Sequence, residues 1–289
     1  MAKPFVNPFV SGQFLELRVD ALVSDGRGLG RHDGVVVLVE DALPGQLVRA
    51  RVAAVRKSLA EAALVEVLER SPDEQEPPCP HAGRCGGCSW QSLAYGRQLA
   101  WKERIVHDAL ERVGKVACPP ILPILPSPSE WGYRNKMEFA FGVSGDGGKA
   151  LGLRERGSRN IVEVTGCLLQ TPLTMRVLEA VRMLSNGAFH DLDGRFLVVR
   201  EPNAGGCFVE LIVGAGGSLE AGERFAEALR AETPEVTGFA LSERLAPSDV
   251  AYGERALYAD GRLEERIGDV RLQMGHNAFF QVNTPAAEL

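Results

Sequence analysis

Three cysteines crowd one short stretch of the sequence, CPHAGRCGGC at residues 79–88. Cys79, Cys85 and Cys88 are half of the six cysteines in a chain of 289 residues, with five residues between the first two and two between the last two. Thiolates this close together can form disulfides, bind zinc or bind an iron–sulfur cluster. The first question is which of these chemistries the rest of the sequence supports.

A tetrahedral zinc ion or a four-iron cluster needs a fourth ligand beside these three cysteines. The two glycines between Cys85 and Cys88 permit the close backbone approach that a bulky inorganic core requires. The candidates for the fourth position are Cys118, Cys167, Cys207 and, for zinc, His81. Spacing alone leaves a cluster, a zinc ion and the absence of any metal all open.

Composition excludes several classes of protein. Apolar residues make up 45% of the chain and charged residues 24%, which is typical of a globular protein with a sizeable core. The sequence contains no apolar run near the roughly 20 residues that span a bilayer, and its first residues lack the pattern of a signal peptide. We therefore expect a cytoplasmic protein that does not enter a membrane, in which reduced thiols favour metal or cluster binding over disulfides.

Basic residues concentrate in one part of a chain whose net charge is −6. Residues 131–160 contain six Lys or Arg against three Asp or Glu, a local net charge of +3. The candidate phosphate-binding residues in this segment are Arg134, Lys136, Arg154, Arg156 and Arg159. Lys and Arg contact phosphates, so the segment is a candidate RNA-binding surface, although a solvated polar face explains the same pattern.

Residues 1–69 have the pattern of a small β-barrel. Residues 14–22 alternate apolar and polar side chains, as a half-buried strand does. Further strands are predicted at 34–40, 47–57 and 61–69, whereas the glycine-rich segment 24–31 predicts a turn or a long hairpin loop. A phosphate-binding surface on this barrel would consist of Arg18, Arg49, Arg51, Arg56 and Lys57.

The residues that follow predict an α+β domain at 70–272, which begins with a linker rich in proline and acidic residues. Helices are predicted within 92–113, where Gly114 would be the C-cap, at 172–186 and at 218–231. The segment VGAGGS at 213–218 predicts a loop between strand and helix, because no acidic ribose-binding residue follows it at the spacing of a dinucleotide site.

Five segments resemble one protein family, the bacterial RNA (uracil-5-)-methyltransferases of the 23S rRNA type, which carry an N-terminal TRAM domain. Residues 12–68 resemble the TRAM barrel, and CPHAGRCGGCSWQ at 79–91, with the distant Cys167, resembles the family's cluster motif. The segments WGYRNKMEFAFG (131–142), GLRERGSRNIVEVTGCLLQ (152–170) and NAFFQVNTPAAEL (277–289) resemble family segments in the family's order.

This resemblance implies a TRAM barrel, a central α+β domain with an iron–sulfur cluster, and the start of a methyltransferase domain at 273–289. It implies that Cys79, Cys85, Cys88 and Cys167 bind a [4Fe–4S] cluster, which leaves Cys118 and Cys207 as spare thiols. It also implies that Gln281 contacts S-adenosylmethionine and that the RNA partner is 23S rRNA. The reaction would be C5 methylation of a uridine, in which a cysteine thiolate first adds to C6.

The family's catalytic cysteine, its base and its cofactor loop all follow the FFQVN segment, so we expect them beyond Leu289. The expected fold class therefore lacks the C-terminal Rossmann-like methyltransferase domain, and this chain alone would be inactive. The alternative is a non-catalytic RNA-binding protein with a TRAM barrel and a metal or cluster site. A radical S-adenosylmethionine methylthiotransferase is disfavoured, because it has three residues between its first two cysteines. Phe279 and Phe280 are expected in the core.

Overall fold

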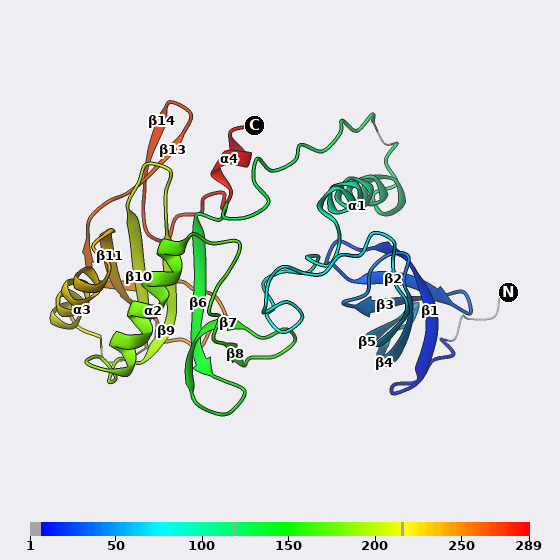
Figure 1. Cartoon of the computed structure of the whole chain (residues 1–289), viewed down its shortest axis with the longest axis horizontal. Coiled ribbons are helices and arrows are strands. Elements are labelled where there is room, and N and C mark those ends of the chain that lie inside the picture. The colour runs from blue at the N-terminus through cyan, green and yellow to red at the C-terminus, as the bar shows by residue number, and fades with distance from the viewer. Residues whose placement is uncertain (1–6, 118, 215–216) are drawn as a thin grey trace. The chain divides into compact units, whose positions relative to one another are not determined.

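A computed structural model describes residues 7–117, 119–214 and 217–289, so the predicted spare thiol Cys118 lies outside the described residues. The chain forms two compact units (Figure 1). Unit 1 consists of Met1–Gly83 and Cys88–Pro126, and unit 2 consists of Arg84–Gly87 and Ser127–Leu289. The domain boundaries predicted after residues 69 and 272 stay predictions.

Unit 1 contains the small barrel expected from the sequence. Its strands are β1 (Phe14–Leu22), β2 (Gly28–His32), β3 (Val35–Glu40), β4 (Leu47–Val55) and β5 (Leu59–Glu69), closed in the order β1-β2-β3-β5-β4. Alternate residues of β1 face the barrel core, where Leu15, Leu17 and Val19 are at most 3% exposed. The period of two that predicted this strand is therefore the pattern of its burial.

Strand β2 lies where the sequence predicted a turn or loop. It pairs antiparallel with both β1 and β3. Its glycines reflect crowding against β1, because a Cβ atom on Gly30 would lie 2.3 Å from the carbonyl oxygen of Arg18. Glycine is normally depleted in strands, and here it is required because no side chain fits. The glycines therefore predicted a turn where the structure has a strand.

A helix packs beside the barrel within unit 1. It comprises α1 (Tyr95–Asp108) and a π-helical turn, η1 (Ala109–Val113), inside the predicted range. The buried Trp101 of α1 packs with Leu22 and Leu43 of the barrel and with Leu93. Gly114 is the C-cap of this helical segment, as predicted, with a right-handed φ of −72°. The left-handed residue is Lys115, at φ +56°.

Unit 2 is built on a sheet of seven strands in the order β12-β11-β10-β9-β6-β7-β8. These strands are β6 (Lys136–Val143), β7 (Lys149–Arg154), β8 (Ile161–Val162), β9 (Gly194–Arg200), β10 (Cys207–Val213), β11 (Val236–Glu243) and β12 (Arg255–Asp260). Two helices, α2 (Pro172–Asn186) and α3 (Leu219–Glu232), agree with the predicted ones, and α3 connects the parallel pair β10 and β11. The segment 213–218 lies between β10 and α3 as predicted, with residues 215–216 outside the described part.

The two faces of this sheet differ in polarity. Helices α2 and α3 cover one face, where Leu197 and Leu211 pack against Phe225 (Figure 1). The opposite face carries charged groups among apolar ones, because Arg200 is 5% exposed and Glu210 is 2% exposed. Burial lowers the pKa of Arg200 from its ordinary value. A buried guanidinium and a buried carboxylate mark this second face as more than a packing surface.

The last elements of the chain fold onto unit 2. They are the hairpin β13 (Leu263–Ile267) and β14 (Val270–Met274) and the short helix α4 (Thr284–Ala287). Glu265 of β13 is 1% exposed, and its carboxylate accepts hydrogen bonds from the Asn203 amide at 2.7 Å and from Asn135 Nδ2 and Thr284 Oγ1, both at 3.2 Å. One buried carboxylate thus joins four segments that are distant in the sequence.

In the part of the chain that the structure describes, no helix is both long enough and apolar enough to span a membrane.

Candidate functional site

Three of the predicted phosphate-binding arginines lie at the compact turn between β7 and β8, with Arg154 as the last residue of β7. Residues 154–160 are called the arginine turn below. The Glu155 amide donates to the carbonyl of Asn160 at 2.9 Å, and Gly157 has the left-handed φ of +67° that the turn requires. Ser158 Oγ and Asn160 Nδ2 donate to the Glu155 carboxylate at 2.9 and 3.1 Å. These hydrogen bonds lower the pKa of Glu155, so the turn is organised around a carboxylate that stays ionised.

Arg154, Arg156 and Arg159 all line one hollow of unit 2, with a volume of about 780 Å³. The other lining residues are Gly86, Gly87, Glu138, Ala140, Leu153, Glu155, Gly157, Ser158, Phe196 and Asp249. The hollow therefore combines guanidinium groups from the turn with apolar side chains of the sheet face opposite the helices. It is concave, and its lining carries three arginines and three carboxylates, so an anionic ligand has to compete with these carboxylates for the guanidinium groups.

A segment that carries one predicted cluster ligand lies against this turn. The Gly86 amide donates to the carbonyl of Arg154 at 3.0 Å, and the Arg156 amide donates to that of Arg84 at 2.9 Å. A Cβ atom on Gly86 would lie 3.2 Å from the Arg154 carbonyl oxygen, so glycine permits this approach. Residues 84–87 and the arginine turn therefore form one small antiparallel arrangement within unit 2.

The predicted cluster ligands fall in both units. Cys85 and Cys167 belong to unit 2 and pack, half-buried, at the border of its main core, while Cys79 and Cys88 belong to unit 1. The Gly87 amide donates to Cys85 Sγ at 3.4 Å. Over residues 7–117, 119–214 and 217–289, the structure gathers no group of three or more His, Cys, Asp or Glu residues that can hold a metal ion.

Cys207, predicted to be a spare thiol, is fully buried in the core of unit 2. Burial raises the pKa of this thiol to about 12. A thiol that stays protonated is a poor nucleophile, so packing accounts for Cys207.

Two of the five predicted phosphate-binding residues, Arg134 and Lys136, are not in the lining of the hollow. Arg134 Nε donates to the carbonyl of Lys136 at 3.0 Å, and Lys136 Nζ forms an ion pair with Glu138 at 2.5 Å. Neither residue lines the hollow. The basic segment 131–160 is thus divided by the fold, and its second half forms the basic site.

Gln281 lies on an irregular segment that is attached to unit 2 through its backbone. Asn135 Nδ2 donates to the carbonyl of Gln281 at 3.0 Å, and the Asn135 amide donates to that of Val282 at 2.8 Å. Arg200 Nη2 donates to the carbonyl of Ala278 at 2.6 Å. The side chain of Gln281 is exposed. Phe279 is 84% exposed, so its predicted place in the core is wrong, because these backbone anchors leave the ring outside.

Asn135, Arg200 and Glu265 are the site residues that the sequence did not reveal. Asn135 immediately follows Arg134, one of the predicted basic residues, but its own partners lie more than a hundred positions away. A lone asparagine or glutamate in a strand pattern gives no signal of such pairing.

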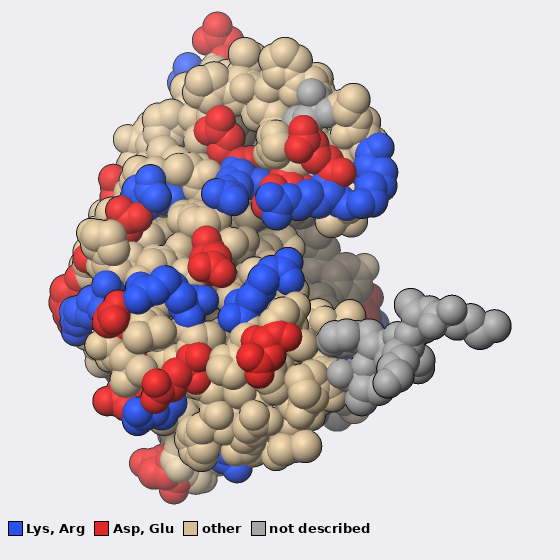
Figure 2. All heavy atoms as spheres, turned by 90° about the vertical axis from the view of Figure 1, so that its right-hand side faces the viewer, with Lys and Arg blue, Asp and Glu red and all other residues tan. Residues whose placement is uncertain are grey.

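Arg18 and Arg49, two of the barrel residues predicted to face phosphates, are paired with carboxylates of the same barrel. Arg49 pairs with Glu16 and Glu66, both at 2.8 Å, and Arg18 pairs with Glu69 at 2.5 Å. Figure 2 shows blue Lys and Arg side chains interspersed with red Asp and Glu on the side of the molecule that displays unit 1. The charges of Arg18 and Arg49 are therefore compensated within the barrel.

Comparisons with known proteins add the family context. Residues 8–65 match the TRAM domain model. The chain is 45% identical to an "Uncharacterized RNA methyltransferase" of Nitratidesulfovibrio vulgaris over 97% of this chain and 63% of that protein. It is 33% identical to an "Uncharacterized RNA methyltransferase" of Thermosynechococcus vestitus over 96% of this chain and 63% of that protein. The chain thus spans just under two thirds of these relatives.

The chain is thus similar to a TRAM domain over residues 8–65 and, over nearly all of its length, to bacterial proteins that are named as RNA methyltransferases. Its fold is similar to that of the solved Pyrococcus abyssi tRNA (uracil-54, C5)-methyltransferase in complex with S-adenosyl-L-homocysteine. The TM-score is 0.69 at 23% identity, over 94% of this chain and 62% of that one. At this identity the likeness concerns the fold.

This likeness corrects the predicted fold class. A methyltransferase domain was predicted to be missing, yet 94% of the chain follows the fold of a solved methyltransferase. The segment expected to begin a truncated domain instead packs onto unit 2, where Thr284 donates to the buried Glu265. The predicted fold class is therefore corrected to that of the solved methyltransferase over the 62% of that protein which this chain covers, and the inference that the chain alone is inactive is not supported.

Proposed function

We propose that this protein takes part in the S-adenosylmethionine-dependent methylation of C5 of a uridine in RNA, with 23S rRNA as the substrate. The observation that carries the proposal is the hollow in which Arg154, Arg156 and Arg159 converge. Guanidinium groups suit phosphate oxygens, and phosphate contacts fix the position of an RNA on a protein. The TRAM domain and the RNA methyltransferase relatives support the same function.

Gln281 is the residue that we assign to S-adenosylmethionine, which supplies the methyl group. Asn135 donates a hydrogen bond to the main-chain carbonyl of Gln281, while the side chain of Gln281 is exposed and available to a ligand. The buried carboxylate of Glu265 in turn accepts from Asn135 Nδ2 at 3.2 Å. Such a chain of contacts orients a binding side chain without using its own amide group.

The four cysteines Cys79, Cys85, Cys88 and Cys167 are assigned to a [4Fe–4S] cluster, for which four thiolates are a complete ligand set. The amide-to-sulfur hydrogen bond from Gly87 to Cys85 suits a thiolate ligand, which accepts such bonds. The cluster would supply structural order, since methyl transfer involves no redox step. Residues 84–87 form backbone hydrogen bonds with residues 154–156, so a cluster bound to Cys85 would also stabilise the arginine turn.

A methylation assay tests the function. The protein, purified anaerobically, is incubated with S-adenosylmethionine labelled in its methyl group and with unmodified 23S rRNA, and the RNA is digested and analysed for labelled 5-methyluridine. We expect label in 5-methyluridine. We also expect Arg156→Ala to weaken RNA binding about fivefold, the effect of one contact of about 1 kcal/mol.

Arg176→Ala is the matched control, because Arg176 is an exposed arginine of α2 that pairs with Glu235 at 2.5 Å and lies outside the hollow. Binding of RNA without any methylation would favour the non-catalytic alternative. Iron and sulfide in equal amounts in the same preparation support the cluster, whereas stoichiometric zinc without iron contradicts it.

A further inference from the structure

The carboxylate of Asp249 lies between two arginines that flank the β7–β8 turn. Oδ1 of Asp249 accepts from Arg154 Nη2 at 2.9 Å, and Oδ2 pairs with Arg159 Nη2 at 3.3 Å. Each oxygen of one carboxylate thus meets a different guanidinium. A phosphodiester has the same arrangement, with two non-bridging oxygens that share one negative charge.

We infer that Arg154 and Arg159 form a subsite for one backbone phosphate of RNA, and that Asp249 occupies this subsite until the RNA displaces it. This inference rests on the proposed function, since it takes RNA as the ligand of the hollow. It adds a specific ligand group, the phosphodiester, and a specific competitor, the Asp249 carboxylate, to that proposal.

The exposure of the three side chains makes the exchange easy. Arg159 is 85% exposed, Asp249 62% and Arg154 35%. Ion pairs in such an environment are weak and are screened by salt, so a phosphate can replace the carboxylate without a large change in the fold. The two arginines therefore keep their positions while their partner changes.

The loop that carries Asp249 is anchored just after this residue. Arg244 Nη1 donates to the carbonyls of Val250 at 3.3 Å and Tyr252 at 2.9 Å. Gly253 is buried, and Asn277 Nδ2 donates to its carbonyl at 3.0 Å. Because the base of the loop is held, Asp249 is presented to the arginines at little cost in conformational entropy.

The other acidic groups of the hollow have different partners. Glu138 pairs with Lys136 at 2.5 Å, and Glu155 accepts hydrogen bonds within its own turn from Ser158 and Asn160. Asp249 is thus the carboxylate that meets both Arg154 and Arg159.

The test is a double-mutant cycle on RNA binding. Binding of a short fluorescein-labelled single-stranded RNA is followed by fluorescence anisotropy over a series of KCl concentrations. The variants are Asp249→Asn, the pair Arg154→Ala with Arg159→Ala, and all three substitutions together. Glu254→Gln is the matched control, because it removes one negative charge close to the same loop, where Glu254 pairs with Arg244 at 3.8 Å.

We expect Asp249→Asn to tighten binding about two- to fivefold at low salt, the range for the loss of weak competing ion pairs. The slope of log K against log salt should steepen by about 0.7 for each additional phosphate that an arginine neutralises. Asp249→Asn should have no effect when both arginines are already alanine, and Glu254→Gln should behave as the wild type. Asp249→Ser serves as the second variant if thermal melting shows that the asparagine variant is unfolded.

Each result has one meaning. If the arginine variant loses affinity but Asp249→Asn binds as the wild type, the competing role of Asp249 is wrong and RNA binding at the turn stands. If the arginine variant binds as the wild type, the turn is not the RNA surface and the proposed function loses its main support. If Glu254→Gln tightens RNA binding as much as Asp249→Asn does, the effect comes from net charge alone, and the inferred phosphate subsite is wrong.

Discussion

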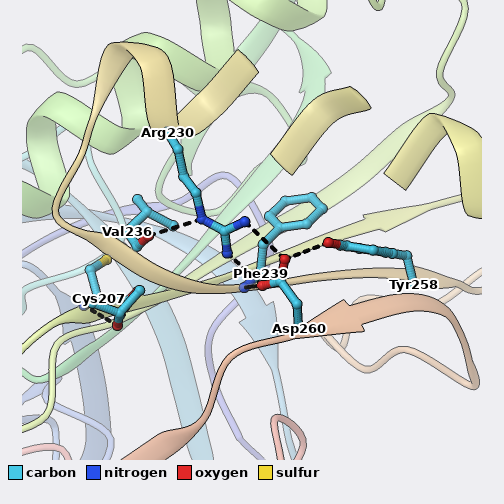
Figure 3. A network of polar contacts seen from close by, with 7 residues as sticks. Cys207, Arg230, Val236, Phe239, Tyr258 and Asp260 are labelled. Atoms are coloured by element: carbon cyan, nitrogen blue, oxygen red, sulfur yellow. Dashed lines mark hydrogen bonds and ion pairs between the residues drawn. The ribbon is translucent and has the colours of Figure 1, made fainter. Parts of the chain in front are cut away.

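Two of the regions of unit 2 in which arginine meets aspartate differ in how many donors each carboxylate receives. At the edge of the sheet, Arg230 of α3 grips Asp260 of β12 with two nitrogens, at 2.8 and 2.5 Å (Figure 3). Asp260 also accepts from the Phe239 amide at 3.1 Å and from the Tyr258 hydroxyl. Arg230 Nε donates in addition to the carbonyl of Val236 at 3.1 Å.

At the arginine turn, two arginines share the single carboxylate of Asp249, whereas Asp260 has one arginine to itself. Each guanidinium contributes one nitrogen to it. Asp260 is 29% exposed and Asp249 62%. An arginine whose hydrogen-bonding groups are all used inside the fold stabilises the fold. Arginines that share one exposed partner remain available to a ligand.

Arg230→Ala should have the largest effect on stability. It removes a two-point, partly buried contact and leaves the Asp260 carboxylate with fewer donors, so we expect a loss of about 2–3 kcal/mol in the free energy of unfolding. Chemical denaturation followed by circular dichroism measures it. Arg230→Lys should recover only part of the loss, because an ammonium group does not form the two-point contact. A change below about 0.5 kcal/mol would erase the contrast between the two regions.

The same contact makes stability depend on acid. The Arg230 side chain, as the main cause, holds the pKa of Asp260 below its ordinary value. A carboxyl whose pKa is lower in the folded state stabilises the fold fully above its unfolded pKa, and this contribution is lost as the pH falls through the folded pKa.

We therefore expect the difference in stability between the wild type and Asp260→Asn to be greatest at neutral pH and to shrink in acid. Thermal melting between neutral pH and about pH 3, near and below the ordinary pKa of aspartate, measures this difference. A difference that stays constant over this range would show that Asp260 stabilises the fold by its shape and not by its charge.

Local patterns in the sequence were enough to predict many elements but not the site. The alternation in 14–22 and the uninterrupted helical segment 172–186 predicted β1 and α2 at their observed bounds, because each pattern is a direct record of burial. Strand β2 escaped prediction because the close approach of Arg18 demands glycine there.

Arg154, Arg156 and Arg159 were grouped as phosphate-binding candidates because they are close in sequence; the fold keeps them at one hollow, and their role stays a prediction. Arg134 and Lys136 were grouped with them only by their nearness in sequence, and the fold gives them other partners. Asp249 is about ninety positions from the turn, so nothing in the sequence connected it with these arginines. Long-range polar pairs of this kind follow from tertiary structure, which local periodicity does not encode.

Arg159→Ala should have the smallest effect on the free energy of unfolding, in contrast to Arg230→Ala. The side chain is 85% exposed, and its ion pair with Asp249 spans 3.3 Å at the surface. Pairs of this kind contribute about 0–1 kcal/mol, so we expect the free energy of unfolding to change by less than about 0.5 kcal/mol. The denaturation assay used for Arg230→Ala measures it under the same conditions. A loss as large as that of Arg230→Ala would mean that the turn depends on this arginine for its fold, and Arg159 would then no longer be available to a phosphate.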